Sequence, residues 1–364
     1  MCNWSMKIIF YCNNKKMSGG IAQLVAIGAQ DAHLVGNPEI SFFRSNYKRH
    51  TNFSHTVERQ VIQGNPSSGG MSTVRFERKG DLLSYVYLTA HTAAGSQELT
   101  SDQWRDAIDE IELLIGGQVV DTQTSLFSEN LAVDTLAQNL ARSSIGSHHN
   151  GQGTLSYFYP LRFSFFENWQ SALPLVALSY HDVEIRIRWG TNLNNYTFQC
   201  MASYIYLDNS ERELLAKKPL NLLMYQVQKS LASGTKVQEL NFNHPVKFIA
   251  ASNTDDANFF GVTNKVKIQI NGTDVADYNY VVPNFTQAAC YFHSPYSMGN
   301  TDDFFLYPFC LDTSRLQPTG TLNFSRLDTA RILSETANID CDFYGVNYNV
   351  LRIENGMGGL MYAN

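Results

Sequence analysis

The chain of 364 residues carries little charge. Its 27 Lys and Arg and 33 Asp and Glu make up 16% of the residues, against roughly 25% in an ordinary soluble protein. The net charge of -6 argues against a free-standing nucleic-acid binder, which would carry a basic excess. No run of about 20 apolar residues is present, which excludes a membrane-spanning helix, and 12% aromatic residues exclude a disordered chain. What remains is a large globular protein whose surface is either polar and uncharged or covered by partners.

Cysteines and targeting signals are also sparse. The six cysteines are scattered without a CxxC pair, and a chain this long can build its core without disulfides, so we predict free buried thiols. The apolar patch at 8–11 is too short for a signal-peptide core, so we expect no signal peptide. Residues 1–16 differ in character from the rest of the chain. Met17 begins the sequence Met-Ser-Gly-Gly, which suits an alternative start of translation. We expect residues 1–16 to be an extension outside the fold.

Strong motifs of catalysis or metal binding are missing. The sequence has no GxSxG, HExxH, Walker loop or HxH pair. His148-His149 is flanked by Ser, Asn and Gly, residues typical of loops. The acidic pairs at 255–256 and 302–303 lack the spaced oxygen ligands of a calcium loop. We interpret all three as polar turns, and we expect no enzyme, no metal and no cofactor.

Short segments of alternating apolar and polar residues dominate the chain and predict strands. In the first half these segments are 56–62, 73–78, 82–88, 108–115, 158–166, 183–189 and 198–207. In the second half they are 222–228, 237–242, 246–250, 266–270, 304–310, 321–325, 330–334 and 343–353. Two helices are predicted, over 125–140 and over 210–217, the second with Pro219 as its stop signal. The pattern predicts two antiparallel β-sandwiches or barrels.

The two halves are weakly similar to each other. Residues 111–120 and 266–275 are both an alternating strand, a two-residue turn with Gly second, and a second strand. Farther on, Tyr159-Pro160 matches Tyr307-Pro308, and Pro174 with Leu178 matches Pro318 with Leu322. The order is preserved at an offset of about 150 residues, which predicts an internal duplication. The linker between the copies is expected at 209–221.

Basic and aromatic residues alternate in one short run near the N-terminus. Arg44, Lys48 and Arg49 are interleaved with three aromatic residues, Phe42, Phe43 and Tyr47. Such interleaving can suit nucleic acid, but a single run in an acidic chain favours a contact between subunits or on an inner surface. We expect no direct specific binding of nucleic acid.

Several segments together resemble a known family. The segment from Ser18 to Asp31, Gly36 to Phe43 and Tyr47 to Phe53 resembles the start of the major capsid proteins of the nucleocytoplasmic large double-stranded DNA viruses, the phycodnavirus, iridovirus and mimivirus group. Similar blocks occur along the chain, and its end, from Asn347 to Ile353 and Gly356 to Leu360, is the most specific of them. The blocks are Gly80-Asp81-Leu82, Ile115 to Gln118, Ala172 to Leu178 with Tyr180-His181, Tyr206 to Asp208 with Glu211-Arg212, and Leu240 to Pro245.

The resemblance implies an all-β fold of two tandem eight-stranded antiparallel jelly rolls with a few short helices. We place an N-terminal arm at 17–41, the first jelly roll at 42–208 and the second at 222–364. The family implies a homotrimer that forms a pseudo-hexagonal capsomer of an icosahedral shell, assembled in the host cytoplasm. The alternatives are a minor capsid protein, a jelly-roll carbohydrate-binding module and a β-sandwich hydrolase.

The implied partners are neighbouring capsomers, minor capsid proteins and an internal viral membrane. We expect the assembly or inner-surface contacts to be made by residues of the arm and of the basic-aromatic run. These residues are Gln23, Gln30, Asp31, Phe42, Phe43, Arg44, Tyr47, Lys48 and Arg49. The segment at 253–264 is short where relatives can carry long outer loops, and no glycan site is carried over.

Overall fold

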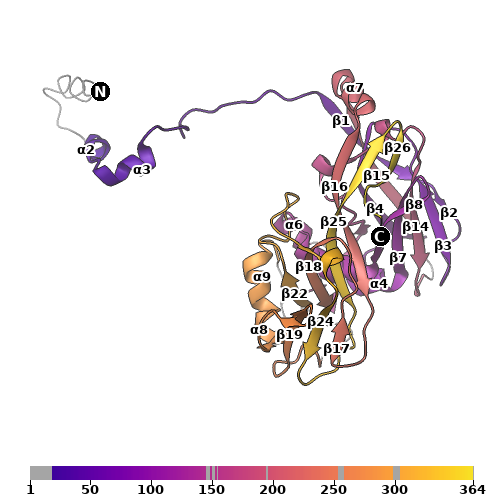
Figure 1. Ribbon diagram of the computed structural model, residues 1–364. Coiled ribbons are helices and arrows are strands. Elements are labelled where there is room, and N and C mark those ends of the chain that lie inside the picture. Colours follow the sequence, from indigo (N-terminus) through magenta and orange to yellow (C-terminus); the bar gives the residue numbers. More distant parts are fainter. Residues whose placement is uncertain are drawn as a thin grey trace. The chain divides into compact units, whose positions relative to one another are not determined.

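The computed structural model describes residues 19–144, 148–149, 152–153, 155–193, 196–252, 258–297 and 304–363. The chain divides into two compact units, with the boundary between Thr51 and Asn52. The described part of the first unit holds three short helical segments, α2 (Gly19–Val25), η1 (Ala29–Asp31) and α3 (Ala32–Val35) (Figure 1). The second unit holds the strands. The predicted start of the first roll at residue 42 lies in the first unit, since the first strand begins at Phe53.

Two antiparallel sheets form the first roll, and each is assembled from strands distant in sequence. One sheet has the order β1 (Phe53–Gln60), β15 (Thr197–Leu207), β4 (Leu82–Thr92) and β12 (Phe158–Pro160), with β5 (Gly95–Ser96) and β13 (Leu173–Pro174) also paired to β4. The other has the order β2 (Ile62–Gln63), β3 (Met71–Arg75), β14 (Val183–Trp189), β7 (Ile108–Ile115) and β8 (Gln118–Thr124). Minor pairs are β6 (Leu99–Thr100) with β11 (Leu155–Ser156) and β9 (His148–His149) with β10 (Gln152–Gly153).

The second roll repeats this arrangement. One sheet has the order β16 (Leu220–Ser230), β25 (Phe343–Glu354), β18 (Pro245–Ser252) and β22 (Phe304–Pro308), with β23 (Leu322–Asn323) on β18 and β26 (Met357–Leu360) on β25. The other has the order β17 (Val237–Glu239), β24 (Ala330–Ser334), β19 (Lys265–Ile270) and β20 (Thr273–Asp274), with β21 (Asn279–Tyr280) on β19. The main strands of both halves follow one jelly-roll order, although β2 has no counterpart among the described strands of the second roll, and the shared order confirms the predicted duplication.

The duplicated hairpins form as predicted. Gly116 and Gly117 join β7 to β8, and Asn271 and Gly272 join β19 to β20, and all four residues have positive φ. That geometry is the two-residue turn whose twist matches the twist of the flanking strands. Within the first roll, β12 ends at Pro160 although a strand to residue 166 was predicted. The chain turns there, with the N–H of Phe166 bonded to the carbonyl of Phe163.

The other two predicted matches between the halves are wrong in register. Tyr159 pairs with Leu88, and Phe305 pairs with Ala251, so the partner of Tyr159 in the second half is Phe305 and not Tyr307. The 3-10 turns η4 (Leu175–Ala177) and η5 (Phe324–Arg326) follow Pro174 and Asn323. Pro174 therefore corresponds to Asn323 and not to Pro318, because strand pairing fixes the register and a shared proline does not.

The helix predicted over 125–140 forms without a gap over 125–135 and is interrupted at 136–139, so three helical elements lie in this region. They are the π-helical turn η2 (Phe127–Leu131), α5 (Ala132–Thr135) and α6 (Leu140–Ser144). The Asn139 side chain accepts the N–H of Arg142 at 3.0 Å, which starts a new helix at Leu140. The remaining helices are α4 (Ser101–Ala107), α7 (Asn209–Lys217), α8 (Val281–Asn284), α9 (Gln287–His293) and the 3-10 turn η3 (Trp169–Ser171). Helix α7 confirms the prediction over 210–217 and occupies the expected linker.

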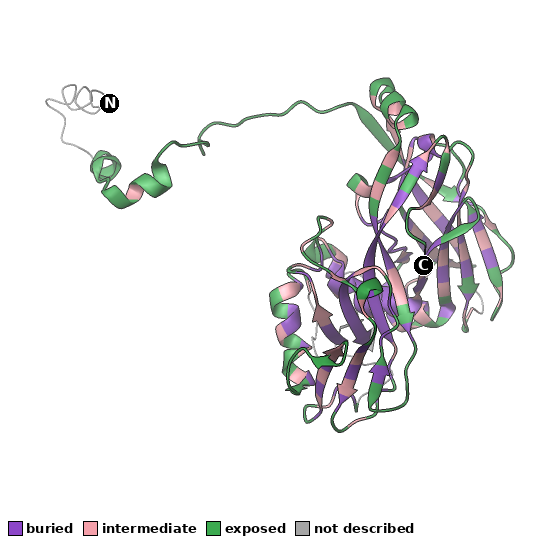
Figure 2. Cartoon of the chain, in the orientation of Figure 1, coloured by how far each residue is buried: buried purple, intermediate pink, exposed green. Residues whose placement is uncertain are grey.

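Buried side chains gather in three clusters (Figure 2). One fills the first roll around Trp189 and Phe198, whose ring centroids are 4.6 Å apart. A second fills the second roll around Phe259, Phe305 and Phe343. The third joins the rolls, because Phe127 of η2 packs against the second roll. Among the described residues, no helix combines the length and apolar character needed to cross a membrane.

Candidate assembly surfaces

The arm predicted at 17–41 continues to Thr51 at the end of the first unit, and residues 19–51, called the arm from here on, expose nearly all of their side chains. Only Asp31 is partly buried. The large apolar residues exposed there are Ile21, Leu24, Val25, Ile27, Leu34, Val35, Ile40, Phe42, Phe43 and Tyr47. Contiguous apolar exposure of this kind marks an interaction surface, so the arm has the composition of a segment that packs on a partner.

The residues predicted as contacts all lie in this arm. Gln23 belongs to α2, and Gln30 and Asp31 to η1. Asp31 has a local role, because its Oδ2 accepts the N–H of Gly28 at 2.6 Å. No packed group forms in the basic-aromatic run: Phe42 is 88% and Phe43 100% exposed. Arg44, Tyr47, Lys48 and Arg49 are exposed as well.

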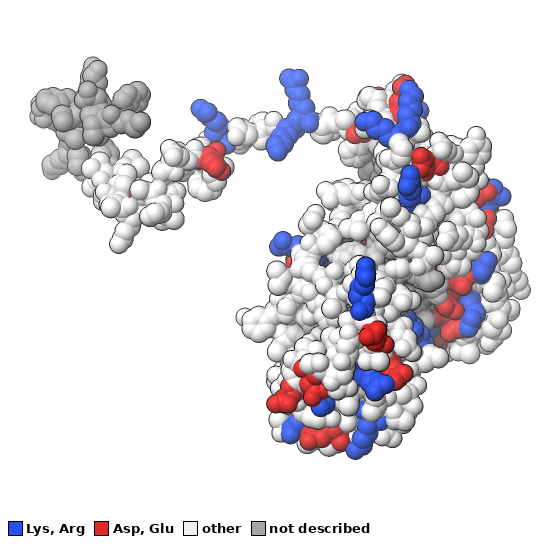
Figure 3. All heavy atoms as spheres, viewed as in Figure 1, with Lys and Arg blue, Asp and Glu red and all other residues white. Residues whose placement is uncertain are grey.

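Charge on the visible face of the molecule is scattered. Figure 3 shows acidic and basic side chains in small mixed groups separated by broad uncharged areas. The ion pairs between Arg188 and Asp109 at 2.8 Å and between Arg186 and Glu112 at 2.8 Å follow this pattern on β14 and β7. Exposed pairs of this kind contribute little to stability. The face in view has no continuous basic track for a phosphate backbone.

Polar contacts join the two rolls along β8 and β16. Oδ1 of Asp121 accepts the N–H of Val227 at 2.9 Å, and its Oδ2 accepts the side-chain N–H of Gln123 at 2.9 Å. The hydroxyl of Tyr225 donates to the carbonyl of Arg162 at 2.9 Å. Burial raises the pKa of Asp121 to about 7, because a carboxylate is poorly solvated there. The joint between the rolls therefore contains a buried carboxyl group that titrates near neutral pH.

A second buried carboxylate lies beside this joint, in η2. Burial raises the pKa of Glu129 to about 8, against the opposing attraction of Arg162 and Arg105. Glu167 is also buried, and it forms an ion pair with Arg142 at 2.7 Å. Perturbed carboxylates can mark active sites, but buried structural networks shift pKa values in the same way. Glu129 belongs to η2, whose neighbouring residues Phe127 and Leu131 pack against the second roll, which favours a structural role.

Three segments that carry the family resemblance meet where the C-terminal hairpin touches the first roll. The N–H of Tyr180 donates to the carbonyl of Gly356 at 2.9 Å, and Nδ1 of His181 lies 2.9 Å from the carbonyl oxygen of Gly358. A Cβ on Gly116 would lie 2.4 Å from the same imidazole, and a Cβ on Gly358 would lie 2.7 Å from Leu178. The glycines therefore allow β26 and the β7–β8 turn to approach closely.

Two more of these segments form a clasp on the linker helix. Oδ1 and Oδ2 of Asp81 accept from Nε and Nη2 of Arg212 at 2.9 and 3.0 Å. Oδ2 of Asp81 also accepts the N–H of Leu207 at 2.8 Å. A bidentate pair of this geometry fixes orientation as well as distance, so it holds α7 against the end of β15.

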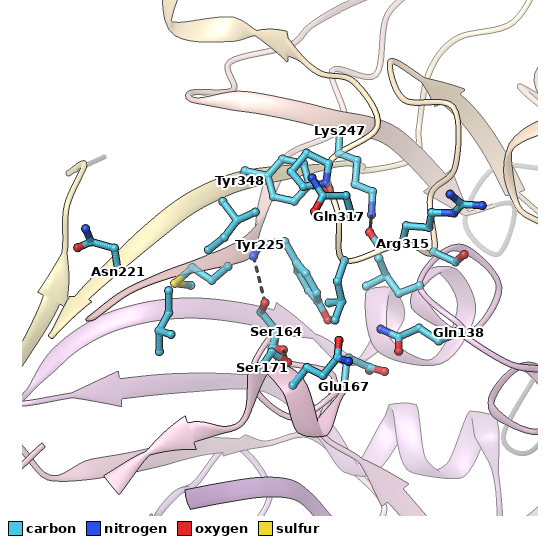
Figure 4. Close-up of a pocket in the computed structure, with 18 residues that line it drawn as sticks. Gln138, Ser164, Glu167, Ser171, Asn221, Tyr225, Lys247, Arg315, Gln317 and Tyr348 are labelled. Atoms are coloured by element: carbon cyan, nitrogen blue, oxygen red, sulfur yellow. Dashed lines mark hydrogen bonds between the residues drawn. The ribbon is translucent and has the colours of Figure 1, made fainter. Parts of the chain in front are cut away.

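A cavity of about 330 Å³ lies between the rolls (Figure 4). Lys247 and Tyr348 lie on one side of it and Ser164 and Glu167 on the other. The ammonium group of Lys247 donates to the carbonyls of Thr313 at 2.5 Å and Arg315 at 3.1 Å, and burial lowers its pKa to about 8. These two hydrogen bonds anchor the loop that contains Thr313 and Arg315.

The structure also bears on the cysteines and the candidate metal sites. Cys200, Cys290 and Cys310 are buried free thiols, which confirms the prediction for these three, and Cys341 is buried as well. No group of three or more His, Cys, Asp or Glu side chains within the described ranges could hold a metal ion. The side chains of His148 and His149 and the acidic pairs at 255–256 and 302–303 lie outside the described residues, as do Cys2 and Cys12.

An exposed aromatic pair on α9 was not predicted from the sequence. Tyr291 is 80% and Phe292 is 73% exposed, and their ring centroids are 5.0 Å apart. Their neighbours Ala289 and Cys290 are buried. The sequence did hold a signal, because Tyr291 and Phe292 follow the small residues Ala288, Ala289 and Cys290. On a helix, this order allows the small residues to face the protein while the two rings face outward.

Comparison with known proteins places the chain in one family. Residues 41–211 match the family model "Major capsid protein N-terminus", and residues 211–359 match "Large eukaryotic DNA virus major capsid protein". The major capsid protein of Pyramimonas orientalis virus is 33% identical, over 96% of this chain and 100% of the relative. That of Paramecium bursaria Chlorella virus 1 is 30% identical with the same coverage.

Solved structures agree with the sequence comparison. A chain of the quasi-atomic model of the PBCV-1 virus capsid superposes with a TM-score of 0.73 at 25% identity, over 89% of this chain and 100% of that chain. The Faustovirus major capsid protein has a TM-score of 0.63 at 11% identity, over 90% of this chain and 94% of that chain, which shows a shared fold. The chain is a member of the major capsid protein family of large eukaryotic DNA viruses.

Proposed function

We propose that this chain is a structural protein of a viral shell, acting as a homotrimeric capsomer rather than as an enzyme. The observation that carries the proposal is the repeated strand order of the two rolls. Three copies around an axis supply six similar blocks, which gives a near-hexagonal outline from one gene product. Hexagonal blocks tile the faces of an icosahedral shell, and the family membership supports this use of the fold.

The assignment implies a place and a set of partners. We infer that the protein resides in the virion, is assembled in the host cytoplasm and contacts neighbouring capsomers. The exposed apolar side chains of residues 19–51 support a role for the arm as a contact toward minor capsid proteins or an internal membrane. An arm of this composition stabilises an assembly by burying its apolar surface only after a partner arrives.

Electron microscopy of the purified full-length chain tests the proposal. The expected particle has three-fold symmetry, a hexagonal outline and six similar lobes around its axis. Particles of one or two lobes at all concentrations and salt conditions would contradict the capsomer assignment. A five-fold ring would instead identify a vertex protein of the same kind of shell.

A further inference from the structure

The two rolls contain equivalent helical connections, but only the connection of the first roll packs against the other roll of the chain. In the first roll, η2 and α5 lie in the connection between β8 and β12. In the second roll, α9 lies in the connection between the equivalent strands β20 and β22. The first connection packs on the neighbouring roll of the same chain, whereas the aromatic pair of α9 is exposed.

Within the chain, η2 covers the outer face of the second-roll sheet. Phe127 of η2 lies 5.6 Å, centroid to centroid, from Tyr344 of β25. The hydroxyls of Thr124 and Tyr344 are 2.9 Å apart. Phe248 and Ala250 of β18 point to the same face and are fully buried. This sheet face therefore behaves as an interior surface.

The equivalent face of the first-roll sheet is open. Strand pairing defines the equivalence: Tyr87 pairs with Met201 as Ala250 pairs with Tyr344. Tyr85 occupies the place of Phe248 and is 43% exposed, and Tyr87 and Met201 are half-buried.

A hollow of about 220 Å³ opens on this face. Tyr85, Tyr87 and Phe158 contribute to its lining. The ring centroids of Tyr87 and Phe158 are 5.6 Å apart in an edge-to-face arrangement. The hollow is large enough for an aromatic side chain and is apolar over much of its wall.

We propose that α9 of one copy docks, through Tyr291 and Phe292, on the outer face of the first-roll sheet of a second copy. This inference rests on the proposed function and names the surfaces that assembly uses. The occupant is a second copy because the chain already forms the equivalent contact internally, between η2 and the second-roll sheet. Each chain offers one α9 and one open face, so the contact runs head to tail, as the contacts of a cyclic trimer do.

Mixed cross-linking tests the contact on full-length chains. One preparation carries Phe292→Cys and a second carries Tyr85→Cys or Met201→Cys, and the two are mixed and oxidised. The four described native cysteines are buried, and all chains carry Cys2→Ser and Cys12→Ser so that the remaining two native thiols do not compete. The expected product is a covalent dimer that appears in the mixture and not in either preparation alone. Chains with both substitutions are expected to give covalent rings that run as trimers.

A disruptive substitution gives a second readout. Phe292→Asp is expected to shift the mass in solution from trimer to monomer, while the far-ultraviolet circular dichroism spectrum of the folded chain stays that of the wild type. Val262→Asp, at another exposed apolar side chain, is the matched control and is expected to remain trimeric.

The outcomes separate this inference from the proposed function. If the wild type is trimeric but yields no mixed dimer, or if the Phe292→Asp variant stays trimeric, the proposed docking of α9 is wrong. The proposal that the chain forms a trimeric capsomer would still hold in both cases. A wild-type chain that is monomeric under all conditions would overturn both.

Discussion

The carboxylate of Asp121 in the first roll accepts the backbone N–H of Val227 in the second roll at 2.9 Å. Burial raises the pKa of Asp121 from 3.8 to about 7, so the folded protein binds this proton more tightly than the unfolded chain does. The contribution of Asp121 to the free energy of unfolding should therefore fall as the pH rises from about 4 to about 7, and then level off. A shift of this size corresponds to roughly 4 kcal/mol.

The substitution Asp121→Asn isolates this effect. Asparagine keeps an acceptor for the N–H of Val227 but does not titrate, so its thermal midpoint should depend less on pH between 5 and 8 than that of the wild type. Asp277→Asn, at an exposed carboxylate, is the control and should follow the wild type. Parallel pH profiles for the wild type and Asp121→Asn would contradict the assignment.

The C-terminal hairpin supports a prediction with a closely matched control. Gly356 and Gly272 have nearly the same φ, +79° and +78°, but a Cβ on Gly356 would lie 2.7 Å from the Tyr180 ring, whereas one on Gly272 meets nothing within 4 Å. Both Gly→Ala variants carry the left-handed backbone penalty of about 1 kcal/mol. For Gly356→Ala the free energy of unfolding should fall by roughly a further 1 to 3 kcal/mol, the usual cost of overpacking.

Urea unfolding of the two glycine variants measures the difference directly. We expect a lower midpoint for Gly356→Ala than for Gly272→Ala. Equal midpoints would show that the contact between the hairpin and the first roll does not stabilise the chain.

The clasp on the linker helix should respond unequally to removal of its two partners. Arg212→Ala removes a partly exposed ion pair and should lower the stability only slightly. Asp81→Ala also leaves the N–H of Leu207 without its acceptor, so it should lower the free energy of unfolding by about 1 to 3 kcal/mol more than Arg212→Ala does. Chemical denaturation of both variants checks the order, and a larger loss for Arg212→Ala would contradict it.

Much of the fold follows from the sequence because strand alternation and turn chemistry are local. The Gly116-Gly117 and Asn271-Gly272 turns mark the hairpins directly. The break at Asn139 was also visible in principle, since asparagine is a good N-cap, but the apolar spacing over 125–140 hid it.

Surfaces were harder to predict than strands. Side chains along a strand point in turn to the core and to the outer face of the sheet, and apolar residues occur on both faces here. The sequence therefore does not show that Phe248 on the outer face is buried by another segment while Tyr85 on the equivalent face is exposed. The burial of Asp121 likewise depends on the second roll, which lies far along the chain. The arm residues could be chosen from composition, but what they contact stays a prediction.

The arm gives a prediction that separates folding from assembly. Deleting residues 17–35 should leave the thermal midpoint of the second unit within about 1 to 2 °C of the wild type, because the deletion removes mainly exposed side chains. The same deletion should reduce the formation of shells or the association with membrane and minor proteins. Sedimentation and particle imaging check this, and intact assembly by the deleted chain would contradict a contact role for the arm.

The mass of the full-length chain in solution tests the central claim most directly. Light scattering coupled to size exclusion should give three times the chain mass of 41.0 kDa, independent of concentration over the micromolar range. A mass of one chain across that range would contradict the account.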